Sequence, residues 1–352
     1  MTKQIEYTTA EQQLKKLKKQ NLLIEDKDFA LTKLKLCGYS NLIKSYRDPY
    51  VVRSNNNLMY RSGVTFNQIF SLYLLDKNLR NAVMAAMQDL EEHVKESAAS
   101  VIANAYGTDD NNYLNYRNYQ NKRKTKERFT LPKILDTLKK TLRTDKDPIH
   151  HYSTNYNTVP PWILFKSIYF STIVNFIDLF KKQEQVALSQ LLYETDNLII
   201  PADTLCKLMM DSLYICLDYR NVAAHGGRTY NHRAKSSLRY DEIFHTSRTE
   251  NLFGISELLL VLKLFKYSRP YDFLNKTLEH ELTRHCTQYP QDITYLGQTL
   301  NIDIIPNEVA FISNNSNKYH LLPHCSGIKN VEEISLSEAL KAGYSPCKRC
   351  AK

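Results

Sequence analysis

The chain has 352 residues, 43% of them hydrophobic and 24% charged, and these ordinary proportions exclude a disordered or fibrous protein. No stretch reaches the roughly 18 uncharged apolar residues of a membrane span, and the start of the chain lacks an apolar signal-peptide core, so we expect a cytoplasmic protein without membrane contact. The 47 Lys and Arg residues outnumber the 37 Asp and Glu residues, and the formal charge of +10 is compatible with a polyanionic partner, although lysine-rich surfaces are common.

Most of the chain, from its start to the region around His280, is expected to be mainly helical. Only nine glycines occur in the whole chain, and apolar residues recur at three- and four-residue spacing. We expect two helices within residues 8–37, the second ending at Gly38. The stretch 47–66 contains Pro49 and a run of asparagines, which favour turns and a short β-ribbon over a helix.

A long helix is predicted over residues 65–105. Thr65 is placed to cap its N-terminus, and Gly107 follows its last turn. Asp76 and Arg80 lie four residues apart on this helix, and we expect them to form a simple helix ion pair worth about a few tenths of a kcal/mol.

The polar segment 106–130 is the best candidate for RNA contact outside the motif described below. Its aromatic rings can stack on unpaired bases while its cations follow the phosphates of single-stranded RNA. The candidate residues are Tyr116, Arg117, Tyr119, Lys122, Arg123 and Lys124. The alternative is a solvated charged loop whose tyrosines cover the core.

Further helices are expected along the rest of the helical region, and a C-terminal module follows. The predicted helices are 131–145, 162–181, 183–195, 203–225 and 251–266. Trp162, the only tryptophan, is expected to anchor the core, and Asp203 to cap its helix. We therefore expect a mainly α protein with three parts: a helical domain over 1–287, a polar linker over 288–306 and a small α+β module over 307–352.

Arg220 and His225 stand out at the end of the helix predicted over 203–225. Five residues turn an ideal helix by about 140°, too far for the two side chains to share a face. Gly226 and Gly227 can end the helix in a left-handed conformation and let His225 turn toward Arg220.

An arginine beside a histidine is suited to RNA cleavage without a metal. The histidine can take a proton from the ribose 2′-hydroxyl or give one to the 5′-oxygen, and the guanidinium can hold the negative charge of the phosphorane. On spacing alone an arginine and a histidine near a helix end are more often structural. Glu91 or Glu92 is a candidate to support the site from the long helix, and the sequence does not choose between them.

The segment RNVAAHGGRTYNHR resembles the Arg-Asn-x-x-x-His-x-x-Arg signature of Abi-like (AbiD/AbiF-type abortive infection) proteins of the HEPN superfamily. YLLDKNLRNAVMAAMQDLEEHV and VPPWILFKSIYFSTIVNFIDLF resemble two further family segments in the same order, and CGYSNLIKSYRDPY resembles an early Tyr-rich element. Together these segments cover roughly residues 20–265. Lys166 and Ser171 depart from the pattern, where an acidic residue and a glycine are expected.

The resemblance implies a fold, a reaction and a site. It implies a HEPN-type helical bundle with peripheral helices and a metal-independent endoribonuclease of antiviral defence or of a toxin–antitoxin system. It makes Arg220 and His225 catalytic and Asn221 a polar partner, with Arg228 and His232 as weaker additions that contact RNA. It further implies a homodimer with a composite cleft, and it makes a regulatory small RNA conceivable beside the RNA substrate.

Three of the seven cysteines crowd together near the C-terminus, where they suggest a zinc site. Cys347 and Cys350 form a C-x2-C pair, Cys325 lies upstream, and the fourth ligand is either His320 or His324. The spacing leaves that choice open, and the resemblance of this region to the Ada-like metal-binding module favours His320. Four protein ligands leave no position for water, so we expect a structural zinc and no cofactor for catalysis.

Two alternatives to the ribonuclease remain at this point. The first is a non-catalytic RNA-binding HEPN protein that uses the same residues to grip phosphate. The second is a regulator whose zinc module binds DNA or protein, with the helical part as a dimer scaffold.

Overall fold

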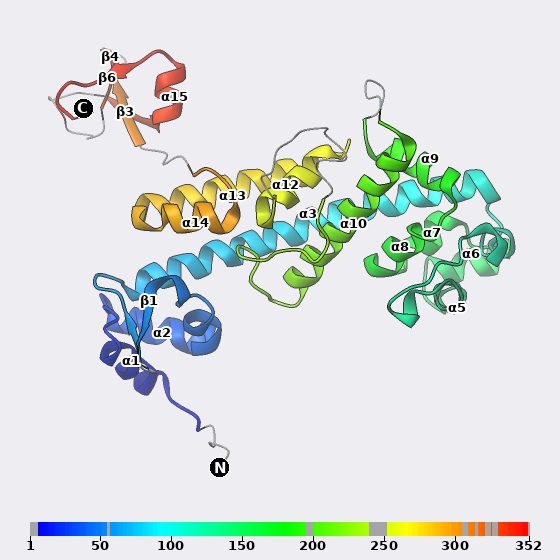
Figure 1. The fold of residues 1–352 in the computed structure, drawn as a ribbon, viewed down its shortest axis with the longest axis horizontal. Helices are drawn as coiled ribbons and strands as arrows, with labels where there is room; N and C mark the ends of the chain where they lie inside the picture. The colour runs from blue at the N-terminus through cyan, green and yellow to red at the C-terminus, as the bar shows by residue number, and fades with distance from the viewer. Residues whose placement is uncertain are drawn as a thin grey trace. The chain divides into compact units, whose positions relative to one another are not determined.

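A computed structural model describes residues 6–54, 57–194, 200–238, 252–304, 309–313, 316–320, 325 and 330–350 (Figure 1). Contacts divide the chain into two compact units. Unit 1 comprises Met1–Leu75, Glu279–Gln298 and Ile302–Lys352, and unit 2 comprises Asp76–Leu278 and Thr299–Asn301. The described part is mainly helical with a small sheet near the C-terminus, as predicted. The domain boundaries predicted from sequence stay a prediction.

The N-terminal part of unit 1 forms short helices and a β-ribbon. The helices are α1 (Ala10–Lys19), α2 (Lys27–Cys37), the π-helix η1 (Ser40–Lys44) and the 3-10 helix η2 (Asp48–Tyr50). Strands β1 (Val51–Ser54) and β2 (Asn57–Tyr60) pair antiparallel, which confirms the predicted ribbon. Thr9 caps α1 in a capping box with Gln12, and Asp26 caps α2, so side chains satisfy the first backbone N–H groups of both helices.

A buried polar network joins distant parts of unit 1. Asp292 Oδ2 accepts a hydrogen bond from the Tyr50 hydroxyl (2.7 Å) and lies 2.9 Å from His285 Nε2, while Asp292 Oδ1 accepts one from Gln68 Nε2 (2.9 Å). His285 Nδ1 lies 2.9 Å from the Ser71 hydroxyl. All of these side chains are buried. Hydrogen bonds within the core therefore compensate the cost of burying the ionisable groups of His285 and Asp292.

The long helix α3 (Phe66–Tyr106) begins in unit 1 and continues through unit 2. Thr65 Oγ1 accepts a hydrogen bond from the Gln68 N–H (3.1 Å), which confirms the predicted cap, and the helix ends before Gly107 as expected. Apolar residues along the whole helix are buried, among them Ile69, Leu79, Met87 and Ile102. Helix α3 therefore contributes buried residues from Phe66 to Ile102.

The remaining helices of unit 2 follow in chain order. They are α4 (Asp110–Tyr113), η3 (Tyr116–Asn118), η4 (Glu127–Phe129), α5 (Leu131–Thr141), α6 (Ile149–Tyr156), α7 (Pro161–Lys166), α8 (Phe170–Ile177), α9 (Lys182–Leu192), α10 (Ala202–Ala224) and α12 (Gly254–Leu264). Helix α13 (Arg269–Gln288) runs from unit 2 into unit 1. Helix α10 packs on α8, α9 and α12 and is buried along one side.

Three local predictions in this region were wrong. The single helix predicted over 162–181 is broken between α7 and α8, because Tyr169 takes an extended conformation at the start of α8. Trp162 is only partly buried, and its neighbours Leu164 and Phe165 fill the core instead. Asp203 lies in the first turn of α10 and pairs with Lys182, whereas Pro201 occupies the cap position.

The polar stretch 288–306, predicted to be a linker, is helical over most of its described part. It contains η5 (Pro290–Asp292) and α14 (Ile293–Leu300), in which Leu296 and Leu300 are fully buried. Apolar residues at four-residue spacing outweigh the proline and glycine that suggested a linker. No helix among the described residues combines the length and the apolar character of a membrane span.

The C-terminal module contains the strands β3 (Val309–Ser313), β4 (Ser316–His320), β5 (Val331–Ser335) and β6 (Ser345–Pro346), and the helix α15 (Leu336–Lys341). The strand order is β5-β3-β4-β6, antiparallel except for the parallel pair of β4 and β6. Among its described residues, the buried core consists of Ala310, Ile312, Tyr319, Ala339 and Cys347. The predicted α+β character of the module is confirmed.

Candidate active site and candidate metal centre

The end of α10 carries Arg220, Asn221 and His225. The helix stops at Ala224, His225 is its C-cap, and Gly226 follows with a φ of +70°. The Gly227 N–H donates to the Val222 carbonyl (2.9 Å) and the Gly226 N–H to the Ala223 carbonyl (3.2 Å). These two bonds form a Schellman motif, in which a glycine takes the left-handed position without steric cost. The helix end predicted at Gly226 is confirmed.

Gly227 is needed for space rather than for its backbone angles. A Cβ atom there would lie 2.8 Å from Val222 Cγ1 and 3.1 Å from the Val222 carbonyl oxygen. The left-handed conformation that we predicted for both glycines is therefore shown for Gly226 alone, because the Gly227 φ is not positive.

Arg220 lies beside Glu91 of α3. Its Nε is 4.0 Å from Glu91 Oε2, and the side chains of Arg220 and Glu91 are 29% and 16% exposed. Glu91 Oε1 also pairs with Lys95 Nζ (2.7 Å), which donates to the Ile168 carbonyl (2.6 Å). A partly buried carboxylate thus faces the guanidinium and is itself held by a buried ammonium group. The structure selects Glu91 over Glu92, whose side chain is exposed.

His225 is exposed to solvent and Asn221 is partly buried. No hydrogen bond or ion pair joins Arg220 to His225 within the described part of the chain. The two side chains leave the helix about 140° apart in an ideal geometry, and the helix ends too late to bring them together. The arrangement offers a guanidinium backed by a carboxylate and a separate, solvent-accessible imidazole at one helix end.

The two weaker additions to the site differ in their surroundings. His232 Nε2 lies 3.2 Å from Asp218 Oδ2, its ring packs edge-on against Tyr219, and its carbonyl accepts a hydrogen bond from the Tyr219 hydroxyl (3.0 Å). His232 is therefore tied to α10. Arg228 is exposed.

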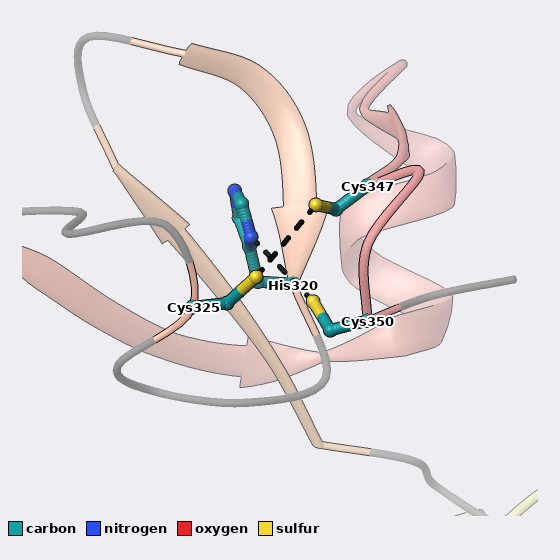
Figure 2. A group of neighbouring side chains, drawn as sticks. All are labelled: His320, Cys325, Cys347 and Cys350. Carbon is teal, nitrogen blue, oxygen red and sulfur yellow. Dashed lines mark hydrogen bonds between the residues drawn. The ribbon is translucent and has the colours of Figure 1, made fainter.

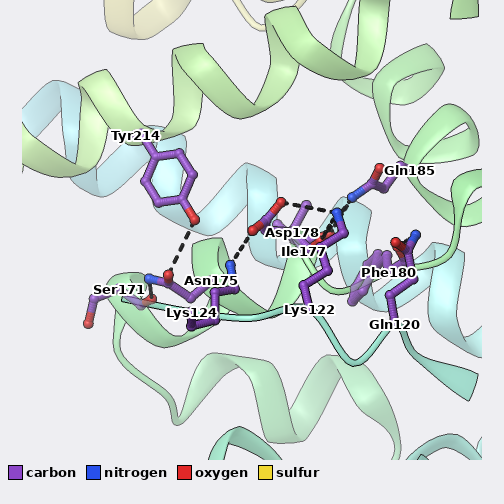
Figure 3. A network of polar contacts seen from close by, with 10 residues as sticks. All are labelled: Gln120, Lys122, Lys124, Ser171, Asn175, Ile177, Asp178, Phe180, Gln185 and Tyr214. Carbon is purple, nitrogen blue, oxygen red and sulfur yellow. Dashed lines mark hydrogen bonds and ion pairs between the residues drawn. The ribbon is translucent and has the colours of Figure 1, made fainter. Parts of the chain in front are cut away.

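Three of the six RNA-contact candidates in the segment 106–130 hold this segment against α8, and Figure 3 shows two of them, Lys122 and Lys124. The Tyr119 ring is buried against Phe176, and its hydroxyl donates to the Tyr113 carbonyl (2.5 Å). Lys122 Nζ donates to the Asp178 carbonyl (2.8 Å), and Lys122 and Lys124 both pair with the Asp178 carboxylate. Stacking on a base requires an accessible ring, so we remove Tyr119 from the expected RNA contacts.

The other three candidates of this segment are accessible. Tyr116 is 44% exposed, and the side chains of Arg117 and Arg123 are also exposed. The prediction that this segment contacts RNA therefore rests on Tyr116, Arg117 and Arg123. The interpretation as a loop whose tyrosines cover the core holds for Tyr119.

His320, Cys325, Cys347 and Cys350 converge in the C-terminal module (Figure 2). The ligand atoms lie within 4.8 Å of one another. Cys325 Sγ is 3.9 Å from Cys347 Sγ, and Cys350 Sγ is 3.6 Å from His320 Nδ1. Tetrahedral zinc with its usual bond lengths separates two sulfur ligands by about 3.8 Å and a sulfur from a nitrogen by about 3.6 Å. The four residues can therefore hold a metal such as zinc.

The sheet explains how two of these residues meet. His320 ends β4, and Cys347 directly follows β6, which pairs in parallel with β4 through Lys318 with Ser345 and Tyr319 with Pro346. The Cys347 N–H donates to the Tyr319 carbonyl (3.0 Å) and continues the pairing. Backbone N–H groups of Arg349 and Cys350 lower the pKa of Cys347 to about 7, which favours the thiolate that a metal requires.

His320 lies with the three cysteines, as predicted, and the choice of His320 over His324 stays a prediction. His324 lies outside the described residues. The remaining cysteines are dispersed: Cys206, Cys216 and Cys286 are buried, and Cys37 is partly buried. Burial raises the pKa of Cys286 to about 11, which keeps that thiol protonated and unreactive at neutral pH.

One comparison with known proteins supports the resemblance to Abi-like proteins. The model of the Abi-like protein family matches residues 32–231, which is more than half of the chain and includes Arg220, Asn221, His225 and Arg228. No curated protein and no solved structure was found to match the chain. The chain therefore belongs to the Abi-like protein family.

Proposed function

We propose that the protein is a metal-independent endoribonuclease of the HEPN type that acts as an effector in abortive infection or in a toxin–antitoxin system. The observation that carries the proposal is the end of α10. There a guanidinium backed by Glu91 and an exposed imidazole occur at the two ends of the Arg-x4-His pattern, within the residues that the family model matches. A helix end with only a structural role would not require an accessible histidine after a partly buried arginine.

The proposed reaction is attack of the ribose 2′-oxygen on the adjacent phosphorus. His225 takes the proton of the 2′-hydroxyl, the bond between the 2′-oxygen and phosphorus forms, and the bond between phosphorus and the 5′-oxygen breaks. An imidazolium group then protonates the 5′-oxygen. The products are a 2′,3′-cyclic phosphate and a 5′-hydroxyl.

Arg220 would stabilise the negative charge that develops on the phosphorane oxygens, and Asn221 would orient the phosphate. Glu91 would hold the Arg220 guanidinium in place for that contact. Arg220 and His225 make no contact with each other within the described part of one chain. In the homodimer that the family resemblance implies, the second chain could supply one of these two side chains to the site. We propose RNA as the substrate, with Tyr116, Arg117 and Arg123 as additional contacts.

We propose a structural zinc ion for the C-terminal module, held by His320, Cys325, Cys347 and Cys350. The distances between their ligand atoms support tetrahedral coordination. When bound, the ion would cross-link β4, the turn after β6 and the chain at Cys325. A closed set of four ligands supports a role in stability and not in the reaction at α10.

Cleavage of labelled single-stranded RNA in EDTA tests the proposal. The full-length protein is compared with His225→Ala and with a matched control, His151→Ala, which also removes an exposed imidazole. We expect the wild type and the control to leave 2′,3′-cyclic phosphates and His225→Ala to lose at least about a hundredfold in rate.

Three results would contradict the proposed mechanism or favour one of the two alternative functions. Cleavage that depends strictly on added Mg²⁺ would contradict the proposed mechanism. RNA binding without cleavage by any of the three proteins, with equal affinities, would favour the non-catalytic RNA-binding protein. Binding of DNA or protein by the full-length chain, lost in Cys350→Ser, would favour the zinc-module regulator.

A further inference from the structure

Asp76 and Arg80 of α3 both hold the backbone that follows His225. Asp76 is fully buried, and its Oδ1 accepts hydrogen bonds from the N–H groups of Thr229 (2.8 Å) and Tyr230 (2.7 Å). Two backbone N–H groups on one buried carboxylate oxygen make charge-assisted hydrogen bonds, which are stronger than neutral ones. Asp76 is thus more than the simple helix ion pair that we predicted.

Arg80 contacts the same segment one helical turn further along α3. Its Nη1 donates to the carbonyl oxygen of Gly226 (3.1 Å), the residue that directly follows His225. Gly226 has the left-handed conformation that ends α10, so its carbonyl no longer follows the direction of the helix carbonyls before it. The Arg80 guanidinium therefore contacts the residue next to the candidate catalytic histidine.

The rest of the segment is held as firmly. The side chains of Thr229 and Tyr230 are buried, and the Tyr219 hydroxyl donates to the His232 carbonyl (3.0 Å). The segment 226–232 is thus fixed at its start by Arg80, in its middle by Asp76 and at its end by α10. His225 is exposed and lies at the junction between α10 and this segment.

We infer that Asp76 and Arg80 are positioning residues for His225, which hold the chain after α10 so that the imidazole is fixed for proton transfer. The inference rests on the proposed function for its catalytic meaning. Its physical basis is separate: proton transfer requires a defined orientation of the imidazole, and that orientation depends on the backbone on both sides of His225.

Arg80→Met is the principal test, because it keeps most of the side-chain length and removes the donor to Gly226. We expect kcat to fall about tenfold or more with KM for RNA within about twofold, since the substrate phosphate does not need Arg80. Arg80→Lys should recover part of the loss, because its ammonium group can still donate to a carbonyl. Lys77→Met, which removes an exposed cation from the same helix, is the matched control and should retain wild-type kcat.

The position of His225 is read independently of activity by NMR of ¹³C-histidine-labelled protein. The His225 signal is identified by its loss in His225→Ala. In Arg80→Met we expect this signal to shift or broaden, while the signals of the exposed His150 and His151 stay unchanged. Asp76→Ala, if it folds, should have the same effect.

The outcomes separate the two proposals. An unchanged His225 signal in Arg80→Met, or an unchanged kcat, would overturn the positioning role. A lower melting temperature alone, with kcat and the signal of the wild type, would show a purely structural role and overturn it too. If the wild type cleaves no RNA, the proposed function fails. A shift of the His225 signal in Arg80→Met would then still support the conclusion that Arg80 positions the imidazole.

Discussion

Glu91 links the candidate active site to the buried part of α3. One of its oxygens faces Arg220 Nε at 4.0 Å, and the other pairs with Lys95 at 2.7 Å. The pair of Glu91 and Lys95 is partly shielded from water, so its charges interact more strongly than those of a surface pair. A change at Glu91 should therefore affect both stability and the orientation of Arg220.

We predict that Glu91→Gln lowers the rate of RNA cleavage by about tenfold, because the guanidinium loses the charge that holds it. The loss of the charge partner of Lys95 should also reduce the free energy of unfolding by about 1–3 kcal/mol. Cleavage assays and urea denaturation measure the two effects. Glu92→Gln is the control, since Glu92 is exposed, and equal effects of the two substitutions would contradict the assigned role of Glu91.

The neighbouring glutamates illustrate what the sequence can predict at this scale. Successive residues on a helix point about 100° apart, so Glu91 and Glu92 face different surroundings although their chemistry is the same. Only the packing of α10 against α3 decides which of them meets Arg220. The same holds for Asp76, whose backbone partners Thr229 and Tyr230 lie far away in the chain.

Asp178 holds the irregular segment 119–126 against the end of α8. It follows the last residue of α8, its carboxylate pairs with Lys122 and Lys124, and its carbonyl accepts a hydrogen bond from Lys122 (Figure 3). The nearby Gln120 side chain donates to the Phe180 carbonyl (2.7 Å). These bonds add to the short backbone pairing of the segment, an isolated antiparallel bridge between Tyr119 and Phe180.

We predict that Asp178→Ala destabilises the protein by about 1–3 kcal/mol, because two partly buried cations lose their shared partner. The segment around Lys122 to Lys126 should then be cleaved faster by trypsin under native conditions. Asp136→Ala is the control: Asp136 pairs with Lys140 on the exposed side of α5 and should change neither property. Equal trypsin sensitivity of the two variants would show that Asp178 does not hold the segment.

Many of the helices were predictable, whereas α6 and α13 were not among those predicted. Periodic apolar residues with a capping residue and a terminating glycine identified α3, and Gly226 identified the end of α10. The break between α7 and α8 was missed because both helices are apolar and no proline or glycine separates them. The burial of Tyr119 was left open as one of two alternatives, because an aromatic residue among cations suits a binding loop as well as a loop that covers the core. In both cases the answer depends on packing between elements, which local patterns do not contain.

In the C-terminal module, few of the residues that the structure describes are buried. Its buried core consists of Ala310, Ile312, Tyr319, Ala339 and Cys347. Small cores of this kind are usually completed by disulfides or by a metal ion. The four candidate ligands come from β4, from Cys325 and from the turn after β6, so an ion would link three separate segments of the module.

We predict that the purified protein contains about one zinc ion per chain and that Cys350→Ser loses it. The module should then become sensitive to proteolysis, since metal binding contributes directly to its folding. RNA cleavage should continue at the wild-type rate. Metal content by mass spectrometry, proteolysis and cleavage assays measure these effects, with Cys37→Ser as the control; a full zinc content in Cys350→Ser would exclude the proposed centre.

The polar network of unit 1 has a consequence for the order in which the protein folds during synthesis. Tyr50, Gln68 and Ser71 find their buried partners in His285 and Asp292, so the core of unit 1 cannot close until Asp292 has left the ribosome. Unit 2 consists almost entirely of the continuous segment Asp76–Leu278, and domains generally fold as units while synthesis proceeds. On a nascent chain, the helix end that carries Arg220 and His225 can therefore form before the segment Met1–Leu75 has acquired its final partners.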